Sequence, residues 1–252
     1  MKKFVEKIAR SILKRVVVNE DREFISPVEF TKTDTDIFNF VLNNNLTVVG
    51  SLRLIATIMS CKYVIENNIY GDFVECGVWR GGNSIAAKLI FEAYDCDKKV
   101  HLFDTFSGLT EPSNVDMTND GTTGREFIAR NSNDDNKVFY IPLENVNNNF
   151  ANASVDMSGV NFVKGDVCET LLDGRNVPKQ IAILRLDTDW YESTKIEMEI
   201  LYPLLSKKGV LLIDDYGHWV GARKAVDEFF ANSEYSRPFF QYTDNTGRAG
   251  IK

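Results

Sequence analysis

A chain of 252 residues, of which 44% are hydrophobic, can bury the core of one complete α/β domain, and it needs no second domain. Its formal net charge of −7 argues against nucleic acid as a main partner, because phosphate backbones select basic surfaces. No apolar run reaches the length of a membrane span, and the four cysteines include no CxxC pair. Reduced thiols in the cytoplasm are therefore the expected state.

Residues 1–46 are expected to form a basic N-terminal helix and an extension, and residues 47–252 the main domain. Lysines and arginines are interleaved with apolar residues through residues 1–18, so this segment lacks the uninterrupted apolar centre of a signal peptide. It could lie on an anionic membrane surface or on a partner, but packing on its own domain is the commoner role and our expectation. Residues 19–46 are polar and mixed, which indicates a loop.

Short apolar runs that end in turn residues alternate with amphipathic segments, a pattern that predicts alternating strands and helices. The predicted strands cover residues 72–77, 99–104, 138–141, 160–166, 182–187, 209–214 and 239–242. The predicted helices cover residues 47–67, 85–94, a segment opening at 169, 193–205 and 223–230. Lys207, Lys208 and Gly209 are expected to close the fourth of these helices. The strand–helix–strand order implies right-handed crossovers and a parallel sheet.

One long polar stretch, residues 108–136, interrupts this alternation. It contains proline, several glycines and asparagines, and few apolar residues. On the ligand-binding edge of a sheet, such a stretch is either a mobile lid or a plain insertion, and we expect a lid. Arg125, Phe127 and Ile128 predict a short helix within it.

Four aspartates follow two neighbouring predicted strands. Asp187 and Asp189 come after the strand at 182–187, and Asp214 and Asp215 end the strand at 209–214. The carboxyl ends of parallel strands meet at one edge, where open α/β sheets bind ligands. Asp187 and Asp189 share a face if the strand persists. Four converging carboxylates repel one another unless a cation lies between them.

A hard cation, Mg²⁺ or Ca²⁺, is the partner that suits ligands which are all oxygens. Zinc is disfavoured, because the chain has two histidines and no cysteine near the cluster. Any one of the four aspartates could instead be a helix cap or a turn former.

The glycine turn after the first predicted strand suggests a second ligand. A turn of this kind fits NAD, FAD or S-adenosylmethionine, but the spacing Glu-x-Gly-x-x-x-Gly-Gly is not the dinucleotide fingerprint. Glu75 would repel a pyrophosphate and would suit an ammonium and a sulfonium. Asp104 is placed for ribose hydroxyls and Asp166 for an adenine amino group. Singly, Glu75 and Asp166 could be ordinary polar residues at strand ends; together these acids outline S-adenosylmethionine.

The chain also resembles the macrocin O-methyltransferase family, bacterial enzymes that use S-adenosylmethionine and Mg²⁺ to methylate sugar hydroxyls. The matching stretches are FVECGVWRGG at 73–82, LFDTFSGL at 102–109, LDTDWYEST at 186–194, IDDY at 213–216 and the tail at 246–252. The resemblance runs from about residue 47 to the C-terminus. It implies a Rossmann-like class I methyltransferase domain, with a mostly parallel central sheet, helices on both faces and the inserted lid region.

By position, the resemblance implies that Asp187, Asp214 and Asp215 bind the metal and that Asp189 is the general base. It implies cofactor contacts for six residues: Glu75, Gly77, Ser84, Asp104, Ser107 and Asp166. Some relatives use histidine as the base. Thr105 and Trp190 depart from the usual residues, serine and a smaller side chain, and Trp190 is expected to reshape the sugar pocket.

The expected function is therefore S-adenosylmethionine- and divalent-metal-dependent methylation of a sugar hydroxyl, on a nucleotide-linked sugar or on a glycan or natural-product precursor. Methylation of a catechol-like vicinal diol is an alternative, because chelation by Mg²⁺ is indifferent to the ring. A non-catalytic S-adenosylmethionine-binding protein is a second alternative, and the four aspartates argue against it. An NAD-dependent nucleotide-sugar enzyme is opposed by Glu75. The resemblance also implies a homodimer or larger homo-oligomer.

Overall fold

The computed structural model describes residues 26–132 and 137–252, of which residues Lys32–Lys252 form one compact unit. The predicted basic helix within residues 1–18 lies outside the described residues. None of the described helices has the length and apolar character that crossing a membrane requires. The four cysteines are free thiols, as predicted.

A mixed, mostly parallel sheet of seven strands lies at the centre of this unit, in the part of the chain that the structure describes. Its strand order is β3-β2-β1-β4-β5-β7-β6, with β1 to β5 parallel and β7 antiparallel to both of its neighbours. The bounds are β1 (Asp72–Cys76), β2 (Val100–Asp104), β3 (Val160–Lys164), β4 (Ile181–Leu186), β5 (Leu205–Ile213), β6 (Gln241–Tyr242) and β7 (Arg248–Ile251). The predicted parallel sheet is confirmed.

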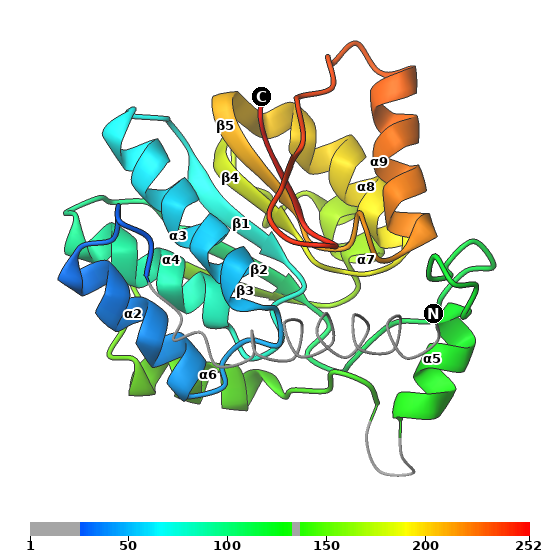
Figure 1. The fold of residues 1–252 in the computed structure, drawn as a ribbon, viewed down its shortest axis with the longest axis horizontal. Coiled ribbons are helices and arrows are strands. Elements are labelled where there is room, and N and C mark those ends of the chain that lie inside the picture. The colour runs from blue at the N-terminus through cyan, green and yellow to red at the C-terminus, as the bar shows by residue number, and fades with distance from the viewer. Residues whose placement is uncertain (1–25, 133–136) are drawn as a thin grey trace, which may run out of the picture. The chain divides into compact units, whose positions relative to one another are not determined.

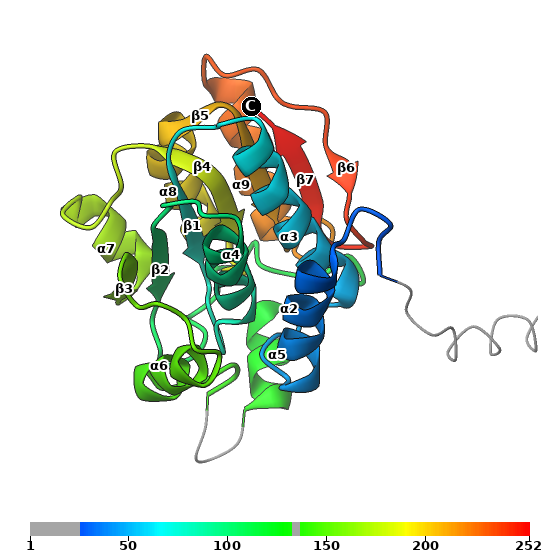
Figure 2. The ribbon, with the colours of Figure 1, turned by 90° about the vertical axis from the view of Figure 1, so that its left-hand side faces the viewer.

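Helices cover both faces of the sheet, as Figures 1 and 2 show: α3 and α4 lie on one face, and α7, α8 and α9 on the other. The helices are α2 (Lys32–Asn43), α3 (Ser51–Glu66), α4 (Gly82–Ala93), α5 (Gly124–Asn131), α6 (Leu143–Asn152), α7 (Val167–Asp173), α8 (Tyr191–Leu201) and α9 (Val220–Asn232). A 3₁₀ turn, Tyr202–Leu204, follows α8. Because both faces are covered, the central strand β4 is buried along its whole length, and this explains why it is apolar except for Arg185.

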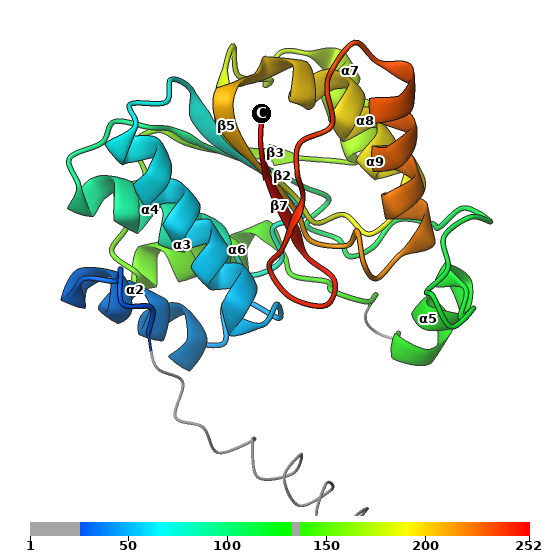
Figure 3. The ribbon, with the colours of Figure 1, turned by 45° about the horizontal axis from the view of Figure 1, so that its top comes forward.

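The strand order reverses between β1 and β4, and the turns after these two strands are in close contact. Gly77 has φ +83°, and a Cβ at this position would lie 1.9 Å from the carbonyl oxygen of Asp187. Only glycine therefore allows the β1 turn to lie against the β4 turn. The crevice at such a reversal is where open α/β sheets bind ligands. Figure 3 shows the carboxyl ends of these strands facing α5 and the inserted segment.

The structure corrects three local predictions. Residues 32–43 are a helix and not a loop, because Ile37, Phe38 and Val41 form one buried stripe that packs on α3 and α4. Residues 138–141 form a turn and not a strand. Lys207 and Lys208 do not close a helix: they lie within β5, where both are exposed. The strand β7 and the helix α6 were not predicted, whereas α5 confirms the predicted helix in the inserted stretch.

Candidate active site

A cavity of about 330 Å³ opens at the carboxyl ends of the parallel strands. Two groups of strand-end residues contribute to its lining. The β1–β3 rim consists of Gly77, Asp104 and Asp166, which follow or end β1, β2 and β3. The β4–β5 rim consists of Asp187, Asp214 and Asp215, which follow β4 and β5. Side chains from the inserted stretch and from the start of α9 close a third side, among them Leu109, Phe127 and Trp219.

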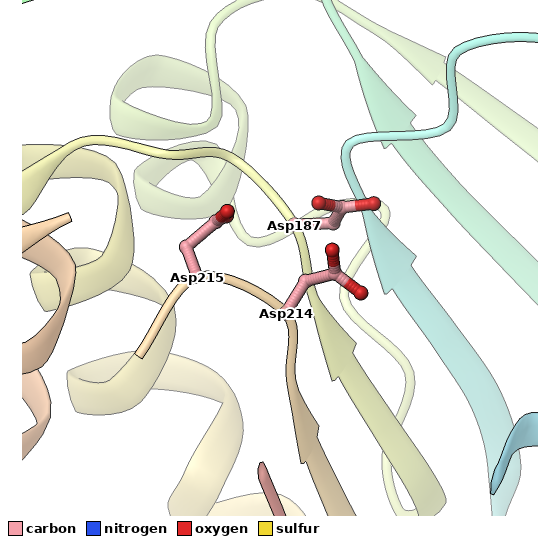
Figure 4. Close-up of side chains that lie close together, drawn as sticks. All are labelled: Asp187, Asp214 and Asp215. Carbon is pink, nitrogen blue, oxygen red and sulfur yellow. The ribbon is translucent and has the colours of Figure 1, made fainter. Parts of the chain in front are cut away.

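The three aspartates of the β4–β5 rim converge, as the parallel pairing of β4 and β5 predicts. One carboxylate oxygen from each lies within 4.8 Å of the others. Figure 4 shows the carboxylates of Asp187 and Asp214 side by side at the two strand ends. The backbone fixes this arrangement, since the N–H of Asp187 donates to Cys76 O at 2.8 Å and that of Asp214 to Leu186 O at 2.8 Å. A donor set of three carboxylate oxygens fits a hard divalent cation.

Two arginines of the chain already offset part of this negative charge. The guanidinium of Arg185 is 2% exposed and donates to Glu75 Oε1 at 2.9 Å, Asp187 Oδ2 at 2.7 Å and Asp214 Oδ1 at 2.6 Å. Arg53, from α3, donates to Asp214 Oδ2. The positive charge that converging carboxylates are expected to require is therefore supplied in part by the chain itself. Five carboxylates, those of the rim with Glu75 and Asp189, still face two arginines.

Arg185 was not among the predicted site residues, although the sequence contains a signal for it. A charged residue in an otherwise apolar, buried strand must have a buried partner. Arg185 also precedes Asp187 by two positions, which predicts that both side chains lie on the same side of the strand end. For Arg53 no comparable signal exists, because it lies 161 residues from Asp214 in the sequence.

Asp189 lines the cavity but lies outside the cluster of three. Asp187 and Asp189 would share a face only if the strand continued through both residues. It does not, because β4 ends at Leu186 and Asp189 has φ +68°. Aspartate tolerates this left-handed conformation better than most residues. Its N–H donates to Asp215 Oδ2 at 3.1 Å, and its Oδ1 accepts from the indole N–H of Trp219 at 2.7 Å. Both bonds hold the carboxylate at the cavity wall.

Burial raises the pKa of three aspartates at or beside this rim, Asp189, Asp214 and Asp215. Burial, followed by the charge of Asp187, raises the pKa of Asp189 to about 8, and the Trp219 hydrogen bond partly opposes the shift. The pKa values of Asp214 and Asp215 are also well above their ordinary range, first through burial and then through neighbouring carboxylates. A cation placed among them would lower all three values, because it favours the ionised forms.

On the β1–β3 rim the carboxylates are engaged with backbone N–H groups. Asp104 accepts from the N–H groups of Val78 at 2.6 Å, Trp79 at 3.2 Å and Phe106 at 2.6 Å. Asp166 is the N-cap of α7 and accepts from the N–H of Cys168 at 2.8 Å. Asp104 therefore shapes the glycine turn, and Asp166 caps α7 at the end of β3, which fits the alternative of an ordinary polar residue at a strand end.

Three of the six residues predicted to contact a cofactor do not line the cavity. Glu75 and Ser84 are buried behind the glycine turn and hydrogen-bond to each other, and Glu75 also pairs with Arg185. Burial raises the pKa of Glu75 to about 7, against the opposing effect of Arg185. Ser107 is exposed, and its N–H donates to Thr105 Oγ1 at 3.1 Å. Gly77, Asp104 and Asp166 do line the cavity.

The inserted stretch is pinned to the helices beside the β4–β5 rim. Asp116 is 1% exposed, and it accepts from the N–H of Tyr191 at 2.7 Å and from the N–H and hydroxyl of Ser113, both at 2.7 Å. The indole N–H of Trp190 donates to Thr110 O at 3.0 Å. Trp190 is buried against Trp219 and does not itself line the cavity, so it shapes the wall from behind.

This sheet order, with a glycine turn after β1 and acidic ends on β4 and β5, defines a class I methyltransferase fold. The structure of the O-methyltransferase NovP superposes on it with a TM-score of 0.71 and 32% sequence identity, over 82% of this chain and 81% of that one. Likeness to the calicheamicin methyltransferase CalS11 (TM-score 0.59, 17% identity, 90% of this chain and 94% of that one) supports the fold alone.

The particular family follows from the sequence comparisons. The family model of the macrocin O-methyltransferases (TylF) matches residues 5–249, and the chain belongs to this family. Demethyldecarbamoylnovobiocin O-methyltransferase of Streptomyces niveus is 36% identical over 190 residues, which are 75% of this chain and 69% of that protein.

A second relative, 8-demethyl-8-(2,3-dimethoxy-alpha-L-rhamnosyl)-tetracenomycin-C 4'-O-methyltransferase of Streptomyces olivaceus, is 33% identical over 202 residues, which are 80% of this chain and 73% of that protein. The chain is an S-adenosylmethionine-dependent O-methyltransferase. The predictions of family, fold and reaction class are confirmed.

Proposed function

We propose that the enzyme methylates a hydroxyl group of a sugar, with a divalent cation held by Asp187, Asp214 and Asp215. The observation that carries this proposal is the convergence of three carboxylates beside the glycine turn, in one cavity. The relative from Streptomyces olivaceus is named for methylation at the 4′ position of a rhamnosyl group. A relative from Micromonospora griseorubida, 31% identical over 187 residues (73% of this chain, 69% of that protein), is named mycinamicin III 3''-O-methyltransferase.

Asp189 is the proposed general base. A divalent cation at the β4–β5 rim would lower the pKa of an acceptor hydroxyl. The carboxylate of Asp189 then takes the proton, while Trp219 and the Asp215 contact keep it oriented. S-adenosylmethionine, when bound, would supply an activated methyl group: its transfer to the acceptor oxygen would break the sulfur–methyl bond and leave S-adenosylhomocysteine, and orientation would supply much of the acceleration.

The β1–β3 rim is the proposed cofactor site. Gly77 lets the methionine part of S-adenosylmethionine approach the backbone, and Asp104 and Asp166 lie where the ribose and adenine would end. Glu75 and Ser84 support the glycine turn from behind. Ser107 lies outside the cavity, at its outer edge. Trp79, Phe127 and Trp219 offer the aromatic surface that the carbon face of a sugar ring contacts.

Release of S-adenosylhomocysteine tests this function directly. The purified enzyme is incubated with S-adenosylmethionine and a panel of nucleotide-activated and natural-product-linked sugars, with Mg²⁺ and again with EDTA. We expect release that requires both a sugar and the metal. Metal-dependent release with catechols alone would show that the acceptor is a vicinal diol on an aromatic ring and not a sugar. Sugar-dependent release that EDTA leaves unchanged would refute the requirement for a divalent cation.

A further inference from the structure

Arg53 is the more exposed of the two arginines that pair with the β4–β5 rim. It lies in the first turn of α3, it lines the cavity, and its side chain is 19% exposed. One end of its guanidinium donates to Asp214 Oδ2, and Nε lies 2.8 Å from Asp244 Oδ2. Arg53 therefore sits between two carboxylates, one on the rim and one in the loop before β7.

Both oxygens of Asp214 are bonded to arginines. Oδ1 accepts from Arg185 Nη2 at 2.6 Å, and Oδ2 accepts from Arg53. A divalent cation that takes Asp214 as a ligand must share an oxygen with a guanidinium group or replace it. Arg185 is 2% exposed and pairs with three carboxylates. It cannot leave, because the loss of any of these ion pairs would leave a carboxylate without its counter-ion. Arg53 can leave, because a second carboxylate holds it.

We propose that Arg53 is the exchangeable counter-ion of Asp214: a divalent cation displaces Arg53 Nη1 from Asp214, while Nε stays paired with Asp244, and this exchange sets the metal affinity of the enzyme. The inference rests on the metal site of the proposed function. Arg53 is thus a positioning residue for the metal, because it acts through Asp214.

Asp244 is built to receive Arg53 with one oxygen only. Its Oδ1 accepts from the N–H groups of Thr246 at 2.9 Å and Gly247 at 2.7 Å, and its Oδ2 faces Arg53. The substitution Asp244→Asn keeps the Oδ1 acceptor that forms the turn and replaces the oxygen that faces Arg53 by an amide NH₂. It removes the receiving carboxylate while leaving the loop intact.

The test is a calorimetric titration with MnCl₂, with no other ligand, of the full-length wild type, Arg53→Gln, Asp244→Asn and the double variant. Arg53→Gln removes the competitor, so we expect about five- to tenfold tighter Mn²⁺ binding, the worth of a partly buried ion pair. Asp244→Asn strands Arg53 on Asp214, so we expect binding several-fold weaker. In the Arg53→Gln background, Asp244→Asn should change nothing, because its effect acts through Arg53.

One control variant tests for a plain charge effect, and two further measurements test whether each variant is folded. Arg175→Gln removes an exposed arginine that pairs with Asp173, and it should leave Mn²⁺ affinity within about twofold. Thermal melts and S-adenosylmethionine binding verify that each variant is folded. Unchanged or weaker Mn²⁺ binding in Arg53→Gln, or equal weakening by Asp244→Asn in both backgrounds, would overturn the exchange alone. A wild type that binds no Mn²⁺ would overturn both the exchange and the proposed metal site.

Discussion

The two rims of the cavity use aspartate in opposite ways. On the β1–β3 rim, Asp104 and Asp166 accept from backbone N–H groups, so their charge stabilises turns of the protein itself. On the β4–β5 rim, Asp187, Asp214 and Asp215 converge with more negative charge than Arg185 and Arg53 offset. The first rim shapes turns of the protein, whereas the second offers three carboxylate oxygens to the divalent cation that we propose.

The position of Arg185 explains how the two rims remain in register. Its guanidinium bonds to Glu75 in β1 and to Asp187 and Asp214 after β4 and β5. Gly77 brings the same turns into van der Waals contact. A methyl donor on the proposed cofactor rim and an acceptor on the proposed metal rim would thereby be held at a fixed separation, which is what in-line methyl transfer needs.

The largest effect should come from breaking the β4–β5 rim. In Asp187→Asn, we expect metal-dependent turnover to fall by about 10³-fold or more, because the proposed metal loses a charged ligand. S-adenosylmethionine affinity should stay within about threefold, because the other rim is untouched. S-adenosylhomocysteine release and calorimetry measure the two quantities. Loss of cofactor binding together with turnover would mean that the rim aspartates serve the fold.

Breaking the β1–β3 rim should give the reverse pattern. In Asp104→Asn, one oxygen that accepts from Val78 and Trp79 or from Phe106 is lost, and each unmet buried N–H costs about 1–3 kcal/mol. We expect S-adenosylmethionine binding about tenfold weaker and a lower melting temperature, with Mn²⁺ affinity unchanged. Weakened Mn²⁺ binding in this variant would show that the rims do not act separately.

The hydrogen bond from Trp219 to Asp189 should set the pH dependence of turnover. A bond to the ionised carboxylate lowers its pKa, so Trp219→Phe should raise that pKa further. A general base works only when unprotonated, and turnover should therefore fall about tenfold at neutral pH and recover as the pH rises. The pH–rate profile measures this shift. A uniform loss at all pH values would assign Trp219 to the cavity wall alone.

The smallest effect concerns stability, at a buried acid beside the rim. Glu197 accepts from Thr188 Oγ1 at 2.8 Å, and burial raises its pKa to about 8. Because its pKa is higher in the folded protein than in the unfolded chain, its contribution to stability is lost as the pH rises toward about 8. Glu197→Gln should therefore raise the melting temperature by several degrees at pH 9, and by less at pH 6.

Equal melting-temperature gains for Glu197→Gln at both pH values would contradict this protonation scheme. The isosteric amide keeps the acceptor for Thr188, so turnover should change little at either pH.

The sequence predicted the β4–β5 rim more fully than the β1–β3 rim, for a physical reason. Asp187, Asp214 and Asp215 each follow an apolar strand, and parallel pairing alone brings them together. The bonds of Asp104 and Asp166 depend on how each turn folds locally, which spacing does not determine. Arg53 reaches the rim from α3, and no local pattern marks a contact across 161 residues. The helix α2 was missed because only three of its apolar residues, Ile37, Phe38 and Val41, are buried, and its first five residues are all polar.

The most direct test of the two-rim site is a crystal structure with S-adenosylhomocysteine and Mn²⁺, with data collected at the manganese absorption edge. We predict one anomalous peak at the β4–β5 rim, coordinated by an oxygen from each of Asp187, Asp214 and Asp215, with the homocysteine sulfur facing it from the β1–β3 rim. An anomalous peak elsewhere, or none at a Mn²⁺ concentration that supports turnover, would contradict this assignment.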